Sequence, residues 1–438
     1  MPKTPASRGH AAHSKNEIKK QEAKATTLRL LNELVPEPDP NVGVRLWDGT
    51  LWPDDLPRRT VIHLKHPGAL RAMFLGSTEM AISEAYIFGD FDLEGRAEDV
   101  FGEVRPVTVL SLGQKASVGM QLASLPRRPA HSHDDWQGEI KLSGKTHSRD
   151  RDRAAVAHHY NASNDFYKLF LDSRMNYSCA YFKSPDDDLE TAQVQKLDGI
   201  CRKLRLQQGQ NFLDIGCGWG GLLVHAAREY GVRATGVTLS QSQYEYTREL
   251  IAREKLDDVC SVRLQDYRDV ASGGESETYD AISSVEMFEH VGTQNLPVFF
   301  GESLKLLKPR GAMFIQGSCR GPLPGGKGGP SFINKYVFPD GELIPIPVVL
   351  GAAEKSGLEV RHVESLREHF ALTLRHWVRR LEDAHEQALG FVNEPTYRVW
   401  RLYMAASLYG FNSRRVNLYQ AVLARPDALG NSGLGIGD

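Results

Sequence analysis

A glycine-rich turn that follows an apolar run is the first place in this sequence where residue types and spacing predict chemistry. The segment FLDIGCGWGG spans residues 212–221. Its apolar residues are typical of a buried strand, and its glycines allow the backbone to approach a ligand closely before a helix begins. The glycines also fit the dinucleotide pattern G-x-G-x-x-G, which many unrelated sequences match. The turn therefore predicts a ligand site at a strand end; its glycines are Gly216, Gly218, Gly220 and Gly221.

The end of the next strand helps to distinguish between ligands. A nicotinamide dinucleotide needs an acidic residue about 20 residues beyond the glycines, where it binds the ribose hydroxyls. The sequence has the uncharged residues Thr238, Leu239 and Ser240 there. Gln243 follows them and can reach a ribose by hydrogen bonds. The lack of an acid weakens the dinucleotide interpretation.

Carboxylates in the first and third strands favour S-adenosylmethionine, which carries a sulfonium and an ammonium group and no phosphate. Asp214 stands two residues before the first glycine, where a cationic ligand needs a negative charge nearby. In QDYRD, Asp266 can accept a hydrogen bond from an adenine amino group, and Tyr267 can flank the adenine ring. We predict S-adenosylmethionine as the cofactor. A purely structural glycine turn and another nucleotide are the alternatives.

The elements that must position these residues alternate along the chain. Strand-like segments separated by helical stretches predict a doubly wound, Rossmann-like α/β sheet. The segments are NFLDIG (211–216), RATGVTL (233–239), CSVRLQD (260–266), YDAISSV (279–285) and GAMFIQG (311–317). Residues from about 365 to 424 are predicted to form helices rich in Tyr, Trp and Leu that could wall an apolar cavity.

Length and composition place this sheet in a chain of two domains. The 438 residues exceed the size at which a single core stops growing. Shifts in pattern and composition predict five parts. They are a basic N-terminus, disordered or helical, at 1–27, a small α+β domain at 28–125, a polar linker at 126–152, the catalytic domain at 153–428 and a flexible tail at 429–438.

Charge, cysteine usage and hydropathy argue against several classes of protein. The formal charge of -2 and the pI near 6.7 give no support for a nucleic-acid partner, although the first thirty residues carry seven Lys or Arg against two Glu. The five cysteines lack a C-x-x-C pair, so neither disulfides nor a metal site is expected, which fits a reducing cytoplasm. The sequence contains no run of roughly 18 apolar residues, so no membrane-spanning helix is predicted.

Six motifs make the sequence resemble the cyclopropane-fatty-acyl-phospholipid synthase family over about residues 154–424. They are HHYNASNDFYKLFLDSRMNYSCAYF (158–182), LDIGCGWGGL, GVTLS, LQDYRD, SVEMFEHVG and NKYVFPDGEL. The resemblance implies a methyltransferase sheet with a lid of helices over an acyl-chain tunnel, and methylene addition across a cis double bond of a membrane phospholipid. It also implies a cofactor site formed by Tyr177, Ser178, Asp214, Gly216, Cys217, Gly218, Trp219, Gly220, Thr238, Leu239, Ser240, Gln243, Asp266 and Tyr267.

The resemblance further implies a catalytic site, from which this chain departs. The family holds a bicarbonate ion as base, and the matching residues are Cys179, Glu289, Gln316, Ser318 and Phe370. The last three replace a histidine, an isoleucine and a tyrosine. Glu286 stands where the family motif has glycine, three residues before Glu289 and on the same face if the segment is helical. We predict that Glu286 supplies the base; in the alternative, it pairs with a cation or caps a helix, and bicarbonate still binds.

The chemistry leaves more than one product and more than one function open. Alkylation of an isolated alkene needs the methyl group held in line and water excluded from the resulting carbocation. Aromatic faces stabilise a cation, and Tyr177, Trp377 and Tyr409 are candidates. Proton loss directly from the new methyl group closes a cyclopropane, whereas a different proton loss leaves a methylene- or methyl-branched chain. The rivals are a lipid-binding protein with a degenerate active site and methylation of a soluble small molecule.

A phospholipid substrate also predicts where the protein works. We expect reversible, peripheral association with the cytoplasmic, inner face of a membrane. The basic N-terminal helix could assist this binding, or it could be a solvated capping helix. A homodimer is left open.

Overall fold

The computed structural model describes residues 8–76, 78–101, 111–129, 136, 138, 142–159, 163–322 and 331–435. The chain divides into two compact units. The first comprises Met1–Gly138, Pro330–Phe332 and Asn393–Ala406, and the second comprises Glu139–Gly329, Ile333–Val392 and Ser407–Asp438. The catalytic domain predicted at 153–428 is continuous, so this division differs from it by assigning two short segments to the N-terminal unit.

The first unit is a small α+β structure. Its four-stranded sheet has the order β2-β1-β3-β4, with β1 and β3 parallel and the other pairs antiparallel. The C-terminal half of α1 is buried here through Leu30 and Leu34, whereas Lys19 and Lys20 are exposed. The elements are α1 (Arg8–Leu34), β1 (Val42–Arg45), β2 (Leu51–Trp52), β3 (Thr60–Leu64), α2 (Ala69–Phe74), α3 (Thr78–Phe88), β4 (Phe91–Glu94), the 3-10 helix η1 (Ala97–Val100) and α4 (Leu112–Ser124).

Two arginines explain why the start of α16 (Glu394–Asn412) clusters with the first unit. Arg398 donates from Nη1 to the backbone oxygen of Tyr86 at 2.8 Å, and Arg401 donates to the hydroxyl of Tyr86 at 3.0 Å. These guanidinium groups satisfy two buried polar atoms of Tyr86 on α3.

The second unit is built on a seven-stranded sheet of order β10-β11-β9-β8-β5-β6-β7. The strands from β5 to β9 are parallel, and β11 is antiparallel to its neighbours β9 and β10. The order reverses beside β5, and such a switch point is where doubly wound sheets bind ligands. The strands are β5 (Asn211–Ile215), β6 (Arg233–Thr238), β7 (Cys260–Leu264), β8 (Tyr279–Val285), β9 (Leu307–Arg320), β10 (Glu359–Ser365) and β11 (Val416–Ala424).

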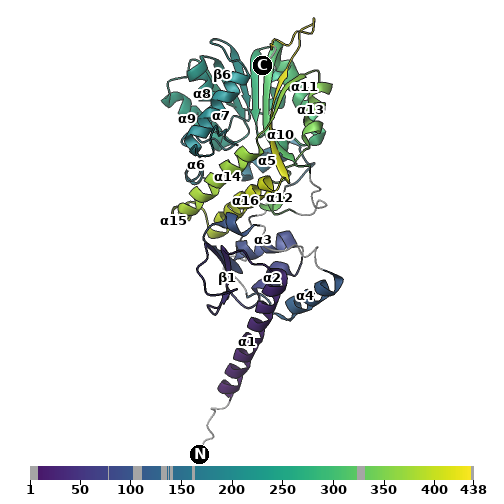
Figure 1. The fold of residues 1–438 in the computed structure, drawn as a ribbon. Coiled ribbons are helices and arrows are strands. Elements are labelled where there is room, and N and C mark those ends of the chain that lie inside the picture. The colour runs from purple at the N-terminus through teal and green to yellow at the C-terminus, as the bar shows by residue number, and fades with distance from the viewer. Residues whose placement is uncertain are drawn as a thin grey trace, which may run out of the picture. The chain divides into compact units, whose positions relative to one another are not determined.

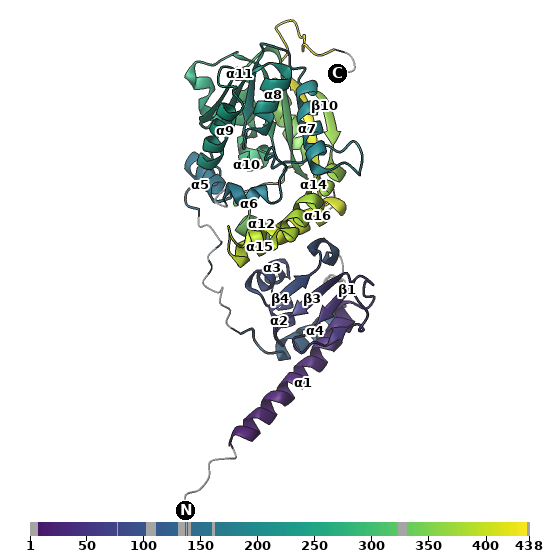
Figure 2. The ribbon, with the colours of Figure 1, turned by 90° about the vertical axis from the view of Figure 1, so that its left-hand side faces the viewer.

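Helices cover both faces of this sheet (Figures 1 and 2). α7, α8 and α9 lie on one face, and α11 and α13 on the other. Phe212 and Leu223 are fully buried on the first face, and Phe299 and Phe300 on the second. The helices include α5 (Arg149–His159), α6 (Asn164–Lys168), α7 (Leu189–Lys203), α8 (Gly221–Tyr230), α9 (Gln241–Arg253), α10 (Phe288–Val291), α11 (Leu296–Leu306), α12 (Phe332–Tyr336), α13 (Ile346–Lys355), α14 (Arg367–Asp383) and α15 (His385–Ala388), with 3-10 turns η3 (Tyr267–Asp269), η4 (Ala271–Gly273) and η5 (Thr293–Asn295).

All five predicted strands are present, and the doubly wound fold is confirmed. The prediction of helices as far as residue 424 is wrong at its end, because Val416–Ala424 form β11. This strand is buried between β9 and β10, and its sequence VNLYQAVLA has no strict alternation of apolar and polar residues, so periodicity does not separate it from a helix. Among the described residues, we find no helix long and apolar enough to cross a membrane.

Candidate active site

A cavity of about 180 Å³ lies at the carboxyl ends of β5, β6 and β8. Asp214, Thr238 and Val285, near the ends of these strands, all line it. Eleven of the fourteen residues predicted to bind the cofactor line this cavity. They are Tyr177, Ser178, Asp214, Gly216, Cys217, Gly218, Trp219, Thr238, Leu239, Gln243 and Tyr267.

Two glycines of the turn need to be glycine for different reasons. Gly218 has φ +55°, and a Cβ built there would meet no atom within 4 Å, so a side chain would project into the ligand space. Gly220 is the N-cap of α8 with φ +83°, and its Cβ would lie 2.6 Å from Cγ2 of Thr247. Gly220 does not line the cavity itself; it allows the turn to pass close to α9.

Asp214 places a buried carboxylate in the cavity. It is 3% exposed, and its Oδ1 accepts a hydrogen bond from the Ser283 hydroxyl at 2.6 Å. Burial raises the pKa of Asp214 to about 6, although the Ser283 hydrogen bond and the charge of Lys196 lower it. A cationic ligand would compensate the buried charge, so this carboxylate fits the ammonium and sulfonium groups of S-adenosylmethionine.

Lys196 is a cavity residue that the sequence reasoning missed. It is 3% exposed, and its Nζ donates to the Ser178 hydroxyl at 2.9 Å. Burial lowers the pKa of Lys196, while the nearby Asp172 and Glu286 carboxylates raise it. An ammonium group here suits the carboxylate of the methyl donor. The available signal was spacing, because Lys196 follows Gln193 by three residues on the buried face of α7.

The end of β6 is arranged by polar contacts around Gln243. Ser240 caps α9 by accepting from the backbone nitrogen of Gln243 at 3.4 Å, and it does not line the cavity. The Thr238 hydroxyl donates to Oε1 of Gln243 at 2.9 Å. The side-chain nitrogen of Gln243 therefore remains as a donor for a ribose oxygen.

Asp266 is held by an arginine and does not line the cavity. Arg268 donates to Asp266 Oδ1 from Nε at 2.8 Å and to Oδ2 from Nη2 at 2.5 Å. Against burial, which raises it, these contacts lower the pKa of Asp266. Nη2 of Arg268 also reaches Asp152 on α5, and Arg268 and Tyr267 line the cavity. The adenine contact of Asp266 stays a prediction.

Glu286 lines the cavity, and its carboxylate meets two hydrogen-bond donors. Its Oε1 accepts from the backbone nitrogen of Cys179 at 2.7 Å and from Nε2 of Gln316 at 2.9 Å. Burial raises the pKa of Glu286 to about 7, against these two hydrogen bonds and the charge of Lys196. Its backbone has φ +53°, a left-handed conformation that few non-glycine residues adopt.

Glu289 lies behind Glu286 in the first turn of α10. Glu286 precedes this helix and has a left-handed backbone, so the two glutamates are not a helical pair. The backbone nitrogen of Ser318 donates to Glu289 Oε1, and Oε2 is buried without a partner among the described residues. Burial, followed by the charge of Glu286, raises the pKa of Glu289 to about 8.

The remaining residues of the predicted anion site lie outside the cavity lining, behind Glu286. The Cys179 nitrogen and the Gln316 amide both donate to Glu286, so this carboxylate occupies the donors that the resemblance assigns to bicarbonate. Burial raises the pKa of the Cys179 thiol, which excludes thiolate chemistry at neutral pH. Phe370 is 5% exposed and packs edge-on to Trp377 at 6.0 Å between ring centroids.

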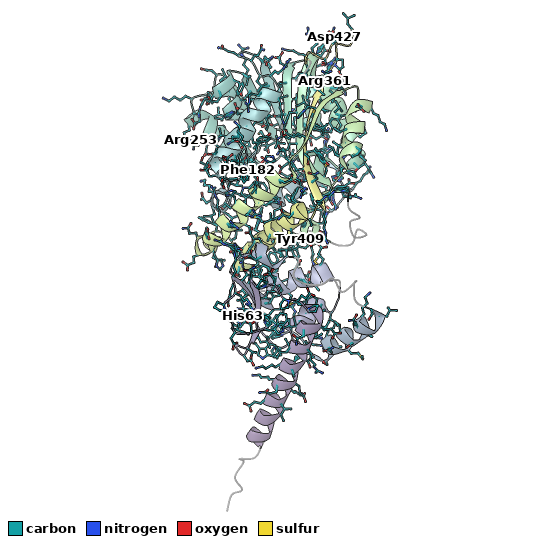
Figure 3. All side chains as sticks on the ribbon, in the orientation of Figure 1. His63, Phe182, Arg253, Arg361, Tyr409 and Asp427 are labelled. Atoms are coloured by element: carbon teal, nitrogen blue, oxygen red, sulfur yellow. The ribbon has the colours of Figure 1, made fainter. Side chains whose placement is uncertain are left out.

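Aromatic rings flank the cavity near Tyr177. Tyr177 lines it, and Trp377 stacks on Tyr177 with centroids 5.2 Å apart. Tyr409, labelled in Figure 3, does not line the cavity and lies beneath the guanidinium of Arg415 at 5.3 Å. Two of the three predicted aromatic candidates thus lie together. Within the described part of the chain, no cluster of three or more His, Cys, Asp or Glu side chains could hold a metal ion.

Known proteins are similar to this chain in sequence and in fold. The family model for mycolic acid cyclopropane synthetase matches residues 147–421. A probable fatty acid methyltransferase of Pseudomonas putida is 36% identical over 394 residues, which cover 89% of this chain and 93% of that protein. A tuberculostearic acid methyltransferase of Mycobacterium tuberculosis is 31% identical over 415 residues, covering 92% of each chain.

A solved structure is similar to part of this chain. It is a mycolic acid cyclopropane synthase complexed with SAH (S-adenosylhomocysteine) and CTAB, 33% identical, with a TM-score of 0.58. The match covers 62% of this chain and 97% of that one. The chain therefore belongs to the mycolic acid cyclopropane synthetase family and is an S-adenosylmethionine-dependent methyltransferase.

Proposed function

We propose that this enzyme methylates the cis double bond of an unsaturated phospholipid acyl chain, and that Glu286 accepts the proton that the reaction releases. One observation carries the proposal. The Glu286 carboxylate lines the same cavity as Asp214 and Gly218, and Cys179 and Gln316 hold it there. A base in this place is within the space that the methyl donor and an alkene must share.

The electron balance requires such a base. The methyl donor supplies an electrophilic methyl group, and the electron pair of its carbon–sulfur bond stays on sulfur. The alkene supplies the electron pair of the new carbon–carbon bond, and positive charge remains on its other carbon. The carboxylate of Glu286 stabilises this charge and then takes a proton. Of the three predicted aromatic candidates, only Tyr177 lines the cavity that would hold this charge, and Trp377 stacks on it.

Proton loss decides the product. When the proton leaves the new methyl group directly, the freed electron pair closes a cyclopropane, which is the product that the sequence resemblance predicts. When a hydride first moves to the cationic carbon, the same loss leaves an exocyclic methylene group. This second candidate is favoured by the replacement of a glycine by Glu286, and by the relative named for tuberculostearic acid, which matches 92% of this chain.

The lipid substrate also places the enzyme at a membrane. We propose peripheral binding to the cytoplasmic face, helped by the exposed basic residues of α1, among them Lys19 and Lys20. The support is the sign of this charge, which matches the anionic lipids of that leaflet.

The test is expression in a bacterial host that makes cis-unsaturated phospholipids and no cyclopropane fatty acids. Proton NMR of the extracted fatty acids separates the isomeric products, because ring protons resonate far upfield and exocyclic methylene protons resonate downfield. A host that carries Glu286→Gln is the control. Binding of S-adenosylmethionine without any new acyl species would instead favour the lipid-binding alternative.

A further inference from the structure

A line of buried amide side chains connects Glu286 with the end of α7. Nε2 of Gln316 donates to Glu286 Oε1 at 2.9 Å, and Nε2 of Gln420 donates to Oε1 of Gln316 at 2.8 Å. Nζ of Lys203 donates to Oε1 of Gln420 at 2.5 Å. Gln316 is 0% and Gln420 is 2% exposed, so water does not compete for the contact between the two amides. A cation at the edge of the unit is thus linked to the proposed base.

Strand register creates this line. Gln420 of β11 lies directly opposite Gln316 of β9 in the antiparallel pair. Gln316 in turn lies opposite Val285 of the parallel strand β8, one residue before Glu286. The two amides therefore meet because of pairing between distant segments, separated by 104 residues.

The two ends of the line fix the direction of both amides. A lysine ammonium has only donors, so Gln420 must turn its oxygen to Lys203 and its nitrogen to Gln316. Gln316 must then accept through its own oxygen and point its nitrogen at Glu286, and the backbone oxygen of Cys179 faces the same nitrogen at 3.5 Å. An ionised carboxylate only accepts, so the arrangement is complete when Glu286 carries a negative charge.

The reversed arrangement would favour the other form of Glu286. If both amides turned over, the oxygen of Gln316 would face the carboxylate. Two acceptors cannot share a hydrogen bond, so Glu286 would have to hold a proton and donate it. A protonated Glu286 cannot accept a proton from substrate. The direction of the line therefore decides whether the group is ready as a base.

We propose that Lys203 is a positioning residue, which orients Gln420 and Gln316 so that an N–H group faces the Glu286 carboxylate. The proposal deepens the proposed function, because it concerns the readiness of the same base. Glu364 holds Lys203 in place through an ion pair at 2.5 Å, and Tyr181 donates to Glu364 at 3.2 Å. Lys203 touches neither the cavity nor the proposed reacting groups.

Other titratable groups that face Glu286 are outside this line. They are Lys196 on α7, Glu289 on α10 and the thiol of Cys179. Substitutions at Lys203 leave all three in place, so a change in the titration of Glu286 reports the loss of Lys203 itself, through its charge and through the amide line.

The experiment titrates Glu286 directly, without substrate, by carbon NMR of side-chain-labelled glutamate. The signal is assigned by its loss in Glu286→Gln. We expect Lys203→Met to move the titration midpoint of Glu286 upward by about one pH unit, because the variant loses a positive charge and no longer excludes the reversed direction of the amides, which only a protonated Glu286 completes. Lys203→Arg retains a donor and should keep the wild-type midpoint. Lys308→Met is the matched control, since it breaks the ion pair to Asp280 at 2.9 Å elsewhere on the same sheet.

A second variant tests the direction without removing the cation. Gln420→Glu keeps the shape of the side chain and still accepts from Lys203. The new carboxylate has no donor, so Gln316 must turn its nitrogen to position 420 and its oxygen to Glu286. The midpoint should again rise. An unchanged midpoint in both Lys203→Met and Gln420→Glu overturns the positioning role, whatever their activity.

Activity then separates this proposal from the proposed function. The pH profile of kcat/KM in Lys203→Met should move upward together with the titration midpoint. A midpoint that moves while the activity profile stays would uphold the amide line and remove Glu286 from the role of base.

Discussion

Glu286 Oε1 accepts a hydrogen bond from the backbone nitrogen of Cys179 at 2.7 Å, although 107 residues separate the two in sequence. Gln316 donates to the same oxygen at 2.9 Å. The donors that the family resemblance assigns to bicarbonate, and the carboxylate that accepts from them, thus belong to the same chain. A tethered carboxylate has a fixed position and needs no dissolved ion, which leads to specific expectations for activity, ligand binding and stability.

Replacement of Glu286 by glutamine should lower turnover without loss of cofactor affinity. The isosteric amide can neither stabilise the cation nor take its proton, and loss of a general base costs on the order of 10²- to 10⁴-fold in rate. Methyl transfer to unsaturated phospholipid vesicles measures the rate, and calorimetry measures the affinity. Glu359→Gln, which removes a carboxylate paired with Arg361 on β10, is the control.

The same tethering predicts indifference to dissolved carbon dioxide. Wild-type activity should be equal in degassed and bicarbonate-supplemented buffer, since Glu286 occupies the donors of the anion site. An enzyme that loses activity on degassing and regains it with bicarbonate would return Glu286 to a structural role beside Glu289.

Cofactor affinity should depend on the ionisation of Asp214. Burial raises the pKa of this carboxyl to about 6 in the free protein, and a cationic ligand binds its charged form better. Affinity for S-adenosylmethionine is therefore full above about pH 6 and falls by up to tenfold per unit below it. Asp214→Asn should bind more weakly and lose this dependence.

Calorimetry at several pH values tests the role of Asp214. Asp280→Asn is the control, because Asp280 is paired with Lys308 and does not line the cavity. The range from pH 5 to 7.5 extends on the order of one unit to each side of the expected pKa of Asp214. If the wild-type affinity for S-adenosylmethionine stays constant over this range, Asp214 is excluded from the cationic subsite.

Much of the cavity lining could be predicted, because its residues follow strand ends in sequence. Asp214, Thr238 and Tyr267 each lie at or just beyond the end of a strand whose apolar run is readable, and parallel strands bring these ends together. The strand that contains Gln420 was not predicted, because a buried central strand has no distinctive period. Its absence from the prediction also concealed the contact between Gln420 and Gln316.

The electrostatic setting of Glu286 could not be predicted either. The contacts of Glu286 with Cys179 and Gln316 depend on long-range pairing, and its left-handed backbone depends on how β8 ends. For Asp266, the sequence-based prediction missed a contact between close sequence neighbours. Its neighbour Arg268 was visible in the sequence, yet only the structure reveals that the two side chains pair.

Removal of the exposed basic turns of α1 should weaken membrane binding. Lys19 and Lys20 are exposed, whereas Ala23 and Leu30 are buried in the first unit, so a deletion that ends at residue 20 spares the core. Each lysine near an anionic surface contributes about 1 kcal/mol, so Lys19→Gln with Lys20→Gln should lower vesicle affinity about thirty-fold at low salt. Sedimentation with anionic and neutral vesicles measures this. Equal binding by the double variant would make α1 a solvated capping helix.

The backbone of Glu286 provides a test of stability that is separate from its chemistry. At φ +53°, a Cβ is strained, and glycine is not. Glu286→Gly and Glu286→Ala lose the same carboxylate and the same hydrogen bonds, so their difference reports the strain. We expect the glycine variant to be more stable by about 1 kcal/mol in denaturant unfolding, whereas alanine is the more stable residue in ordinary backbone.

Glu302 on α11 serves as the reference for that comparison, because it lies within a regular helix. There the order should reverse, with Glu302→Ala more stable than Glu302→Gly by about 1 kcal/mol. Equal stabilities of the two Glu286 variants would mean that this position carries no strain. The expected order means that the chain keeps a strained glutamate where glycine would be more stable. Such a cost persists where a side chain is needed for activity, and both Glu286 variants should accordingly be inactive.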